Sequence, residues 1–251
     1  MTLALLALMV GCSTAPAESG RTPAAHTPAA HAPSAVPPVA TTAWRSLLPL
    51  SGRQLTGVLL PVAELPAGST TEADSGLSGR GVKAMADLAQ RYPACAPVLT
   101  VMSDQMVGST RLWYVTGSNT FANRTLVDVG GIPGGRSHER FDKLKDAVYG
   151  GGCTGFRPDK PYGGDQLQVE PVSSDALEAP AVGFRILLPT GAMTSQGGLT
   201  WVFLYVAVGE NRVLFFMADD TAHAPALRTD LVTAQIHRLV TAVPSPDTPT
   251  T

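Results

Sequence analysis

Thr200-Trp-Val-Phe-Leu-Tyr-Val-Ala-Val-Gly-Glu-Asn-Arg-Val-Leu-Phe-Phe-Met-Ala218 is the stretch that decides the fold of this chain. Its aromatic and β-branched residues favour strands, and Gly209-Glu-Asn-Arg212 predicts a tight turn, so we expect a hairpin of strands at 200–208 and 212–218. Successive side chains of a strand point to opposite faces, and here both faces are apolar. We therefore expect this hairpin in the interior of a sheet, covered on both sides at least locally.

The remaining pattern predicts helices and further strands around this hairpin. Ser51 can cap a short first helix that runs to Leu59–Leu60, and apolar spacing of three and four residues predicts helices over about 80–91, 137–149 and 225–242. We expect Ser137 to be the N-cap of the third of these helices, and Arg238 and Asp230 to face water on the last.

Further strands are predicted at 110–116, 122–129, 165–172 and 181–188. The strand at 122–129 is expected to be half-exposed, because Arg124 and Asp128 alternate with Val127 and Val129. Hairpins and segregated helices together predict an α+β fold: a mainly antiparallel sheet with helices packed on it.

Composition is consistent with one folded domain at 44–243, followed by a flexible tail at 244–251. The chain has 251 residues, with 18 basic residues against 20 acidic ones and no basic cluster. Nucleic-acid binding requires a footprint of Lys and Arg, so we expect no nucleic-acid partner.

The first twelve residues predict where the protein works. An apolar run from Leu3 to Val10 is too short to span a membrane, has the length of a signal-peptide core, and ends at Gly11-Cys12. We expect a lipoprotein signal peptide at 1–11 and lipidation of Cys12, which anchors the protein on the extracytoplasmic face of the cell membrane. Lipoprotein signals usually have Leu three residues before the cysteine, where this chain has Met9. No Lys or Arg precedes the apolar run, which suggests that the true start lies upstream of Met1. The alternatives are an ordinary secretory signal and an apolar N-terminus with an incidental Cys.

Residues 12–43 are rich in Pro, Ala and Thr and contain almost no large apolar side chain. Such a segment cannot bury a core, so we expect a disordered linker with polyproline II character. His26 and His31 lie in this linker, and two histidines on a flexible chain make a poor metal site, so we predict none there.

Cys95 and Cys153 remain as a pair once Cys12 carries lipid. In an oxidising compartment an even number of cysteines indicates a disulfide, which we predict between these two. The alternative is two free thiols, although neither a Cys-x-x-Cys spacing nor a nearby His supports a redox or metal pair.

Two groups of residues can be compared with known ligand-binding motifs. Gly130-Gly-Ile-Pro-Gly-Gly-Arg-Ser137 has the glycine spacing of a phosphate-binding loop, but Arg136 replaces the required Lys and Pro133 removes a backbone N–H, so we expect no nucleotide site. Asp219, Asp220 and His223 gather at a strand end, without the further ligands that Ca²⁺ or Zn²⁺ requires. We interpret them as a solvated turn.

His138 and His237 lie in the third and last helices, and neither pairs with an obvious nucleophile. The sequence contains none of the common nucleophile or zinc-protease motifs, so we expect no catalytic residue. Trp113 and Tyr114 point to opposite faces of their strand; one should lie in the core, whereas the other can line a groove or be ordinary surface.

The whole arrangement resembles a known family. The lipobox-like Cys12, the linker, the opening Leu50-Ser-Gly-Arg-Gln-Leu55, the following Glu64-Leu-Pro-Ala-Gly68 and the cysteine placement are similar to the PknH-type extracellular sensor domains of actinobacterial receptor Ser/Thr kinases and free-standing lipoproteins. The resemblance covers about 45–242. It implies a ligand-binding domain with a cleft between sheet and helices and no catalytic activity. The kinase domains carry two disulfides, of which one can form here.

We therefore expect a lipid-anchored, extracytoplasmic, non-enzymatic sensor that binds a small molecule, an envelope component or a partner protein. No cofactor and no metal are expected, and the ligand-binding residues are not identified by any motif. The alternatives are a structural interaction protein of the envelope and an extracytoplasmic hydrolase with an unrecognised site, built around His138 or His223.

Overall fold

A computed structural model describes residues 48–74, 79–104, 109–116, 123–132, 136–158, 164–175, 177, 179–189, 198–220 and 227–242. The expected signal peptide, Cys12, the linker and the tail lie outside these residues.

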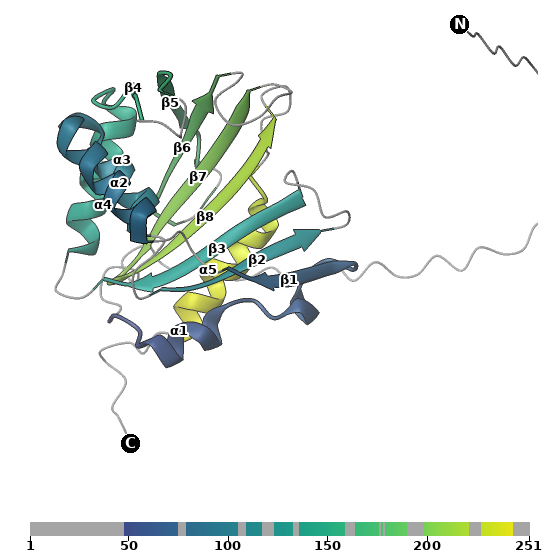
Figure 1. Cartoon of the computed structure of the whole chain (residues 1–251). Helices are drawn as coiled ribbons and strands as arrows, with labels where there is room; N and C mark the ends of the chain where they lie inside the picture. Colours follow the sequence, from purple (N-terminus) through teal and green to yellow (C-terminus); the bar gives the residue numbers. More distant parts are fainter. Residues whose placement is uncertain are drawn as a thin grey trace, which may run out of the picture. The chain divides into compact units, whose positions relative to one another are not determined.

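The described residues form helices, short 3₁₀ turns and one sheet (Figure 1). The helices are α1 (Gly52–Val58), α2 (Gly79–Arg91), α3 (Ala96–Asp104), α4 (Ser137–Tyr149) and α5 (Thr229–Ala242), and the 3₁₀ turns are η2 (Val62–Glu64) and η3 (Pro93–Cys95). The strands are β1 (Ser69–Ala73), β2 (Thr110–Thr116), β3 (Arg124–Gly131), β4 (Gly155–Phe156), β5 (Leu167–Val172), β6 (Ala181–Leu188), β7 (Leu199–Val208) and β8 (Asn211–Asp220).

Within the described residues, the sheet has eight strands in the order β1-β2-β3-β8-β7-β6-β5-β4, and every neighbouring pair is antiparallel. The hairpin of β7 and β8 occupies the centre, as its two apolar faces predicted, because each face is buried under other elements. Gly209 has a φ of +58°, which the two-residue turn between Val208 and Asn211 requires. The predicted α+β fold is confirmed.

Helices cover the two faces of the sheet unequally. One face, here called the α5 face, carries Tyr114, Val127, Leu204 and Phe215 and packs against α1 and α5. The opposite face, here called the α4 face, packs the apolar side chains of β5, β6 and β7 under α2, α3 and α4. In Figure 1 these three helices gather beside β4–β6, away from β1–β3. The two faces therefore enclose two separate cores.

The elements η2, β1, η3, α3 and β4 were not expected from the sequence. Tyr92-Pro93 ends α2 as predicted, but η3 and then α3 follow directly, because proline is tolerated in the first turn of a helix. Strand β1 has the polar sequence Ser-Thr-Thr-Glu-Ala, which lacks the apolar alternation that predicts a strand. It forms a strand because it pairs with β2 at the edge of the sheet.

The prediction that strand 122–129 is half-exposed is wrong. The alternation does assign the faces, with Arg124 and Asp128 on one and Val127 and Val129 on the other. However, β3 lies between β2 and β8, and Thr125 and Asp128 are both buried, Asp128 with no exposed surface at all. Asp128 can be buried because Arg212 of the neighbouring strand β8 pairs with it.

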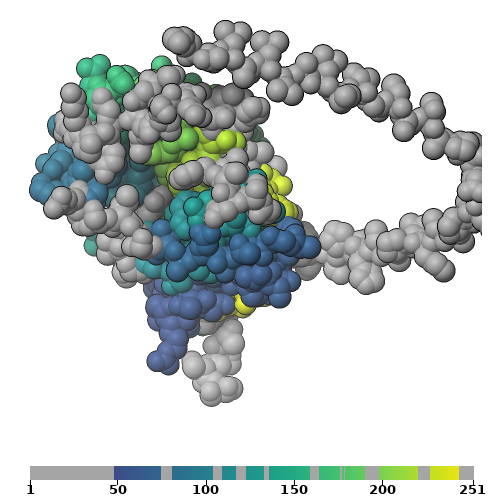
Figure 2. Space-filling model, turned by 45° about the vertical axis from the view of Figure 1, so that its right-hand side comes forward, coloured from purple at the N-terminus to yellow at the C-terminus, as the bar shows by residue number. Residues whose placement is uncertain are grey.

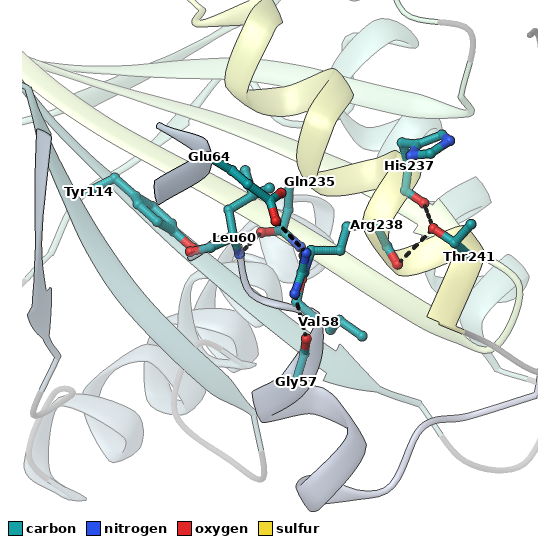
Figure 3. Close-up of polar contacts among 9 residues, drawn as sticks. All are labelled: Gly57, Val58, Leu60, Glu64, Tyr114, Gln235, His237, Arg238 and Thr241. Atoms are coloured by element: carbon teal, nitrogen blue, oxygen red, sulfur yellow. Dashed lines mark hydrogen bonds and ion pairs between the residues drawn. The ribbon is translucent and has the colours of Figure 1, made fainter. Parts of the chain in front are cut away.

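One helix prediction needs a further correction, because Arg136, not Ser137, is the N-cap of α4, and Ser137 is buried as the first helical residue. Asp230 is exposed on α5 as expected, and Arg238 is partly exposed. The Arg238 guanidinium also contacts the Glu64 carboxylate at 2.8 Å and the Gly57 carbonyl at 3.4 Å (Figure 3).

The predicted disulfide is present between Cys95 and Cys153, both buried, and closes a loop of 58 residues. Cys95 directly precedes α3 and Cys153 follows α4, so the bond fastens these two helices over the α4 face. Cross-links of this length stabilise a fold mainly by restricting the unfolded chain.

The N-terminal segment 48–60 is fastened to the α5 face by two buried carboxamides. Asn211 accepts a hydrogen bond from the Leu50 N–H at 2.8 Å and donates one to the Leu48 carbonyl at 2.7 Å. Gln235 accepts from the Leu60 N–H at 3.2 Å and donates to the Val58 carbonyl at 2.7 Å. Both carboxamides are fully buried, so each satisfies backbone groups that lie outside any sheet.

Figure 3 shows how this fastening converges on one turn of α5. Gln235 and Arg238 point from α5 towards residues 57–64, while Tyr114 approaches from β2 and donates its hydroxyl to the Leu60 carbonyl at 3.0 Å. Burial raises the pKa of Tyr114 to about 12, against the opposing effect of this hydrogen bond, so the phenol remains a donor throughout the physiological pH range.

Candidate functional site

The α4 face changes character from one end of the sheet to the other. Over β5–β7 it is apolar and covered by helices, whereas over β1, β2, β3 and the first part of β8 it carries charged side chains. Here we call this second region the charged half; its charged members are Glu72, Asp74, Arg111, Arg124, Asp128 and Arg212. Alternation along each strand places them together, although they come from four strands.

The Asp74 carboxylate organises the middle of the charged half. One oxygen accepts from Arg111 at 3.2 Å, and the other accepts from the Trp113 indole N–H at 3.2 Å. The Arg111 and Asp74 side chains are only 10% and 18% exposed, so both are largely withdrawn from water. This bridge fixes the orientation of the indole ring relative to the strand.

A second ion pair lies at the outer rim. Arg124 of β3 bonds Glu72 of β1, and its guanidinium carbon lies 5.3 Å from the centre of the Trp113 ring. The geometry is a cation–π contact, which stabilises an arginine at an aromatic face by about 0.5–2 kcal/mol. Glu72 and Arg124 are the most exposed ion pair of the charged half and the part that a ligand would reach first.

The third ion pair is buried. Arg212 lies 3.4–3.5 Å from one oxygen of Asp128, and neither side chain is more than 4% exposed. Burial raises the pKa of Asp128 above its ordinary value, against the opposing positive charge of Arg212. The neighbouring Ser109 hydroxyl also opposes this rise in the pKa of Asp128. The buried Asp128–Arg212 ion pair is poor evidence for stability, because the cost of removing both charges from water offsets their mutual attraction.

Three aromatic rings join the charged half to the apolar half. Trp113 and Trp201 both meet Phe216 edge-on, with ring centres 5.9 Å and 6.1 Å away, and all three side chains are partly exposed. Phe203 lies beneath them, 4.9 Å from Phe216. In Figure 2 strands β3 (teal) and β8 (yellow-green) reach the surface between α2 and β1. Partly exposed aromatic rings beside fixed polar groups are typical of ligand sites.

Trp113 and Trp201 lie near the end of the sheet where the connections after β2, β6 and β8 begin, whereas Arg111 and Arg212 lie towards the opposite end. Antiparallel pairing brings the end of β2 at Thr116, the end of β6 at Leu188 and the end of β8 at Asp220 to this end. Trp113 and Trp201 lie within three residues of a strand terminus there. Loops mounted on a rigid sheet are where proteins most often bind ligands.

The structure separates the candidates that the sequence singled out. Tyr114 lies in the core and Trp113 on the charged half, which confirms that one of the two is buried. Residues 133–135 of the glycine-rich segment, the Asp220 side chain and His223 lie outside the described residues. Asp219 is at the end of β8.

The two described histidines lie apart from the charged half. Among the described residues the His138 Nε2 atom is buried without a hydrogen-bond partner, and the His237 backbone carbonyl accepts a hydrogen bond from Thr241. Within the described residues, no three His, Cys, Asp or Glu side chains lie close enough to hold a metal ion. No described helix is long and apolar enough to cross a membrane.

Sequence reasoning missed most of the charged half. Arg111, Asp74 and Arg212 carried no motif, and Trp201 and Phe216 were read only as strand core. The available signal was alternation, since Arg111 and Trp113 share one face of β2 while Leu112 and Tyr114 share the other. Which strands are neighbours decides whether such residues meet, and the sequence does not specify the order β1-β2-β3-β8.

No protein-family model and no curated protein matches this chain. The solved structures that are similar to it include the following two. The extracellular domain of PknH from Mycobacterium tuberculosis has 11% identity and a TM-score of 0.42, over 77% of this chain and 97% of that one. A putative uncharacterized protein from Mycobacterium smegmatis has 12% identity and a TM-score of 0.36, over 80% of this chain and 98% of that one.

The first of these is a domain of the type that the sequence resembles. At 11–12% identity and TM-scores below 0.5, neither similarity carries a site residue or a function to this chain.

Proposed function

We propose that this protein is a non-enzymatic sensor that binds a ligand outside the cytoplasm at the charged half of the sheet. The observation that carries the proposal is the coincidence, on one part of the α4 face, of three ion pairs with partly exposed Trp113, Trp201 and Phe216. Charged pairs on a sheet face contribute little to folding. A recognition surface explains their presence better than stability does.

The chemistry of the site favours binding over catalysis. Every carboxylate of the charged half has an arginine partner, and none lies against a described histidine. A general base needs an accessible group held towards a substrate, and a nucleophile needs a base beside it. Paired charges and an aromatic surface provide fixed hydrogen-bonding groups instead.

The proposed extracytoplasmic location rests on two features. The buried Cys95–Cys153 disulfide is typical of an oxidising compartment, and the run ending at Cys12 is typical of a lipoprotein signal. We propose that the mature protein begins at a lipidated Cys12 and that residues 12–43 hold the domain away from the membrane.

Fractionation of cells that make the wild-type chain or Cys12→Ser tests the anchor. We expect wild-type protein in the membrane fraction with the added mass of a lipid, and the variant without lipid mass. Equal fractionation of both proteins, with no lipid mass on either, would refute the anchor while leaving the ligand proposal open.

Native mass spectrometry tests ligand binding. The full chain is purified from its own envelope without denaturant and compared with the denatured protein. Extra mass that is lost on denaturation, and that is reduced in Arg124→Gln, supports binding at the charged half. The matched control is Arg185→Gln, because Arg185 pairs with Glu170 across two strands on the other face with comparable exposure. Ligand mass retained equally in both variants places the ligand elsewhere and refutes this site.

A further inference from the structure

We propose that strand β1 is a self-association edge, at which two copies of this chain pair antiparallel and join their sheets into one. Such a dimer is independent of the ligand proposed above. Three features of the molecule support it: the difference between the two edges of the sheet, the composition and exposure of β1, and the register that a two-fold axis gives to two copies of β1.

The two edges of the sheet differ in how they are protected. An edge strand carries unpaired N–H and C=O groups, and proteins commonly block such edges with proline, lysine or a short additional strand. The edge beyond β6 has two of these devices. The two-residue strand β4 covers β5 at Leu167 and Gln168, and the exposed Pro171 in the second half of β5 lacks an N–H. A further strand therefore gains little by pairing with β5.

Strand β1 forms the opposite edge without these devices. Its sequence, Ser69-Thr-Thr-Glu-Ala73, contains no proline, lysine or arginine, and threonine is favoured in strands. Among the described residues β1 pairs with β2 on one side, in a regular register without a bulge. The backbone groups of alternate β1 residues consequently point away from β2, where they can pair with another strand.

The side chains leave this edge accessible. Thr70 and Ala73 lie on opposite faces of β1, and both are exposed. Glu72, the charged residue of β1, is bonded by Arg124 of β3, so its carboxylate is directed back over β2 instead of outwards across the edge. In Figure 2 β1 (blue) lies at the surface of the molecule. A strand of a second molecule can therefore reach β1 from either face.

A two-fold axis through Thr71 gives the register that we expect. In this register Thr71 faces its own copy, Thr70 faces Glu72 of the second copy, and Ser69 faces Ala73 of the second copy. An axis through Glu72 would instead place two carboxylates directly opposite each other, which destabilises a strand pair. Antiparallel pairing about an axis perpendicular to the sheet keeps the α4 faces of both copies on the same side, so the two charged halves become neighbours.

The dimer should be weak and reversible, because a five-residue edge strand buries less surface than a standard protein interface. Sedimentation equilibrium from about 10 μM to about 1 mM measures its Kd, which we expect to lie within this range. The protein is the full chain with Cys12→Ser. This substitution removes the expected lipid acceptor and leaves no thiol outside the Cys95–Cys153 bond.

Cysteine substitutions in the same chain test the register. The Cα atoms of directly opposite residues in an antiparallel pair lie about 4.5–5.5 Å apart, which a disulfide can span. Thr71→Cys should therefore form a disulfide-linked dimer under mild oxidation. Thr70→Cys is the matched control, because each introduced cysteine is offset from its copy by two residues, about 7 Å along the strand in addition to the spacing between strands. A disulfide cannot span that distance, although Thr70 is the more exposed of the two residues.

Charge substitutions test the same register without a covalent bond. Thr70→Glu places a carboxylate opposite Glu72 of the second copy, twice in each dimer, and should raise the dimer Kd about tenfold. Thr70→Lys places an ammonium group there and should lower the Kd. Gln168→Glu adds the same charge as Thr70→Glu at an exposed position of β5 and should leave the Kd unchanged. The Tm of each variant and its intact Cys95–Cys153 bond show whether it is folded.

Three results would overturn self-association at β1: the chain stays monomeric up to about 1 mM, Thr70→Cys links as readily as Thr71→Cys, or Thr70→Glu and Gln168→Glu have the same Kd. The last two would place the dimer contact elsewhere on the molecule. A disulfide between Thr71→Cys and a different protein in oxidised cells, without a linked dimer, would assign the edge to another partner and would also overturn the proposal. The ligand of the charged half is tested separately by native mass spectrometry, so either proposal can fail without the other.

Discussion

Replacing Gln235 by methionine should detach the N-terminal segment from α5 and measurably destabilise the protein. Gln235 is fully buried and is hydrogen-bonded to the Val58 carbonyl and the Leu60 N–H, which are themselves on buried residues. Methionine has a similar length and helix propensity, so the loss comes from the two backbone groups left without partners. Each such group costs about 1–3 kcal/mol, partly offset by burying an apolar side chain.

The expected net loss is about 3 kcal/mol, which for a domain of this size lowers the Tm by about 6–12 °C. Thermal and urea unfolding of the oxidised full chain measure it. Gln90→Met is the matched control, because Gln90 is exposed on α2 and the same substitution there should change stability by less than about 0.5 kcal/mol. If both variants unfold at the same temperature as the wild type, the carboxamide does not hold the segment.

Other substitutions test other parts of the fold. The double variant Cys95→Ala/Cys153→Ala should lose about 4 kcal/mol by unfolding calorimetry, and a reductant should lower the Tm of the wild type but not of the variant. Because the pKa of Asp128 is raised, the charged carboxylate disfavours the folded state, so wild-type stability relative to Asp128→Asn should fall as pH rises from about 4 through that raised pKa. Asp230, whose pKa a hydrogen bond from its neighbouring arginine lowers, should behave oppositely: wild-type stability relative to Asp230→Asn is present above about pH 4 and lost at lower pH. Urea titrations at several pH values measure both trends, and parallel curves would refute them. Gly57→Ala in α1, where an added Cβ meets nothing within 4 Å, should stabilise the protein by about 0.5–1 kcal/mol in the same assay.

The charged half and the N-terminal fastening lie on opposite faces of one sheet. β2 connects them, since Trp113 faces the charged half and the next residue, Tyr114, bonds the segment that follows the expected linker. A ligand that moved Trp113 would therefore act on a strand that also holds the N-terminal segment 48–60. Neighbouring residues on opposite faces are the shortest route by which one face of a sheet can influence the other.

The sequence by itself determined the central hairpin, α4, the disulfide partners and the α+β class. Each of these depends on local information: alternation along β7 and β8, apolar spacing between Phe141, Leu144 and Val148, and an even pair of cysteines. Such local patterns predict structure correctly because a strand or helix must direct its apolar side chains towards a core, wherever that core lies.

Only the tertiary structure decided the charged half, the burial of Asp128 and the roles of Asn211 and Gln235. Their partners lie on other strands or more than 80 residues away along the chain, as with Asp128 and Arg212 or Gln235 and Val58. The local sequence around a polar residue shows only that polar and apolar side chains alternate along the strand. Whether the polar side chain faces water, a ligand or an opposite charge depends on which strand lies beside its own. That strand order follows from the folding of the whole sheet.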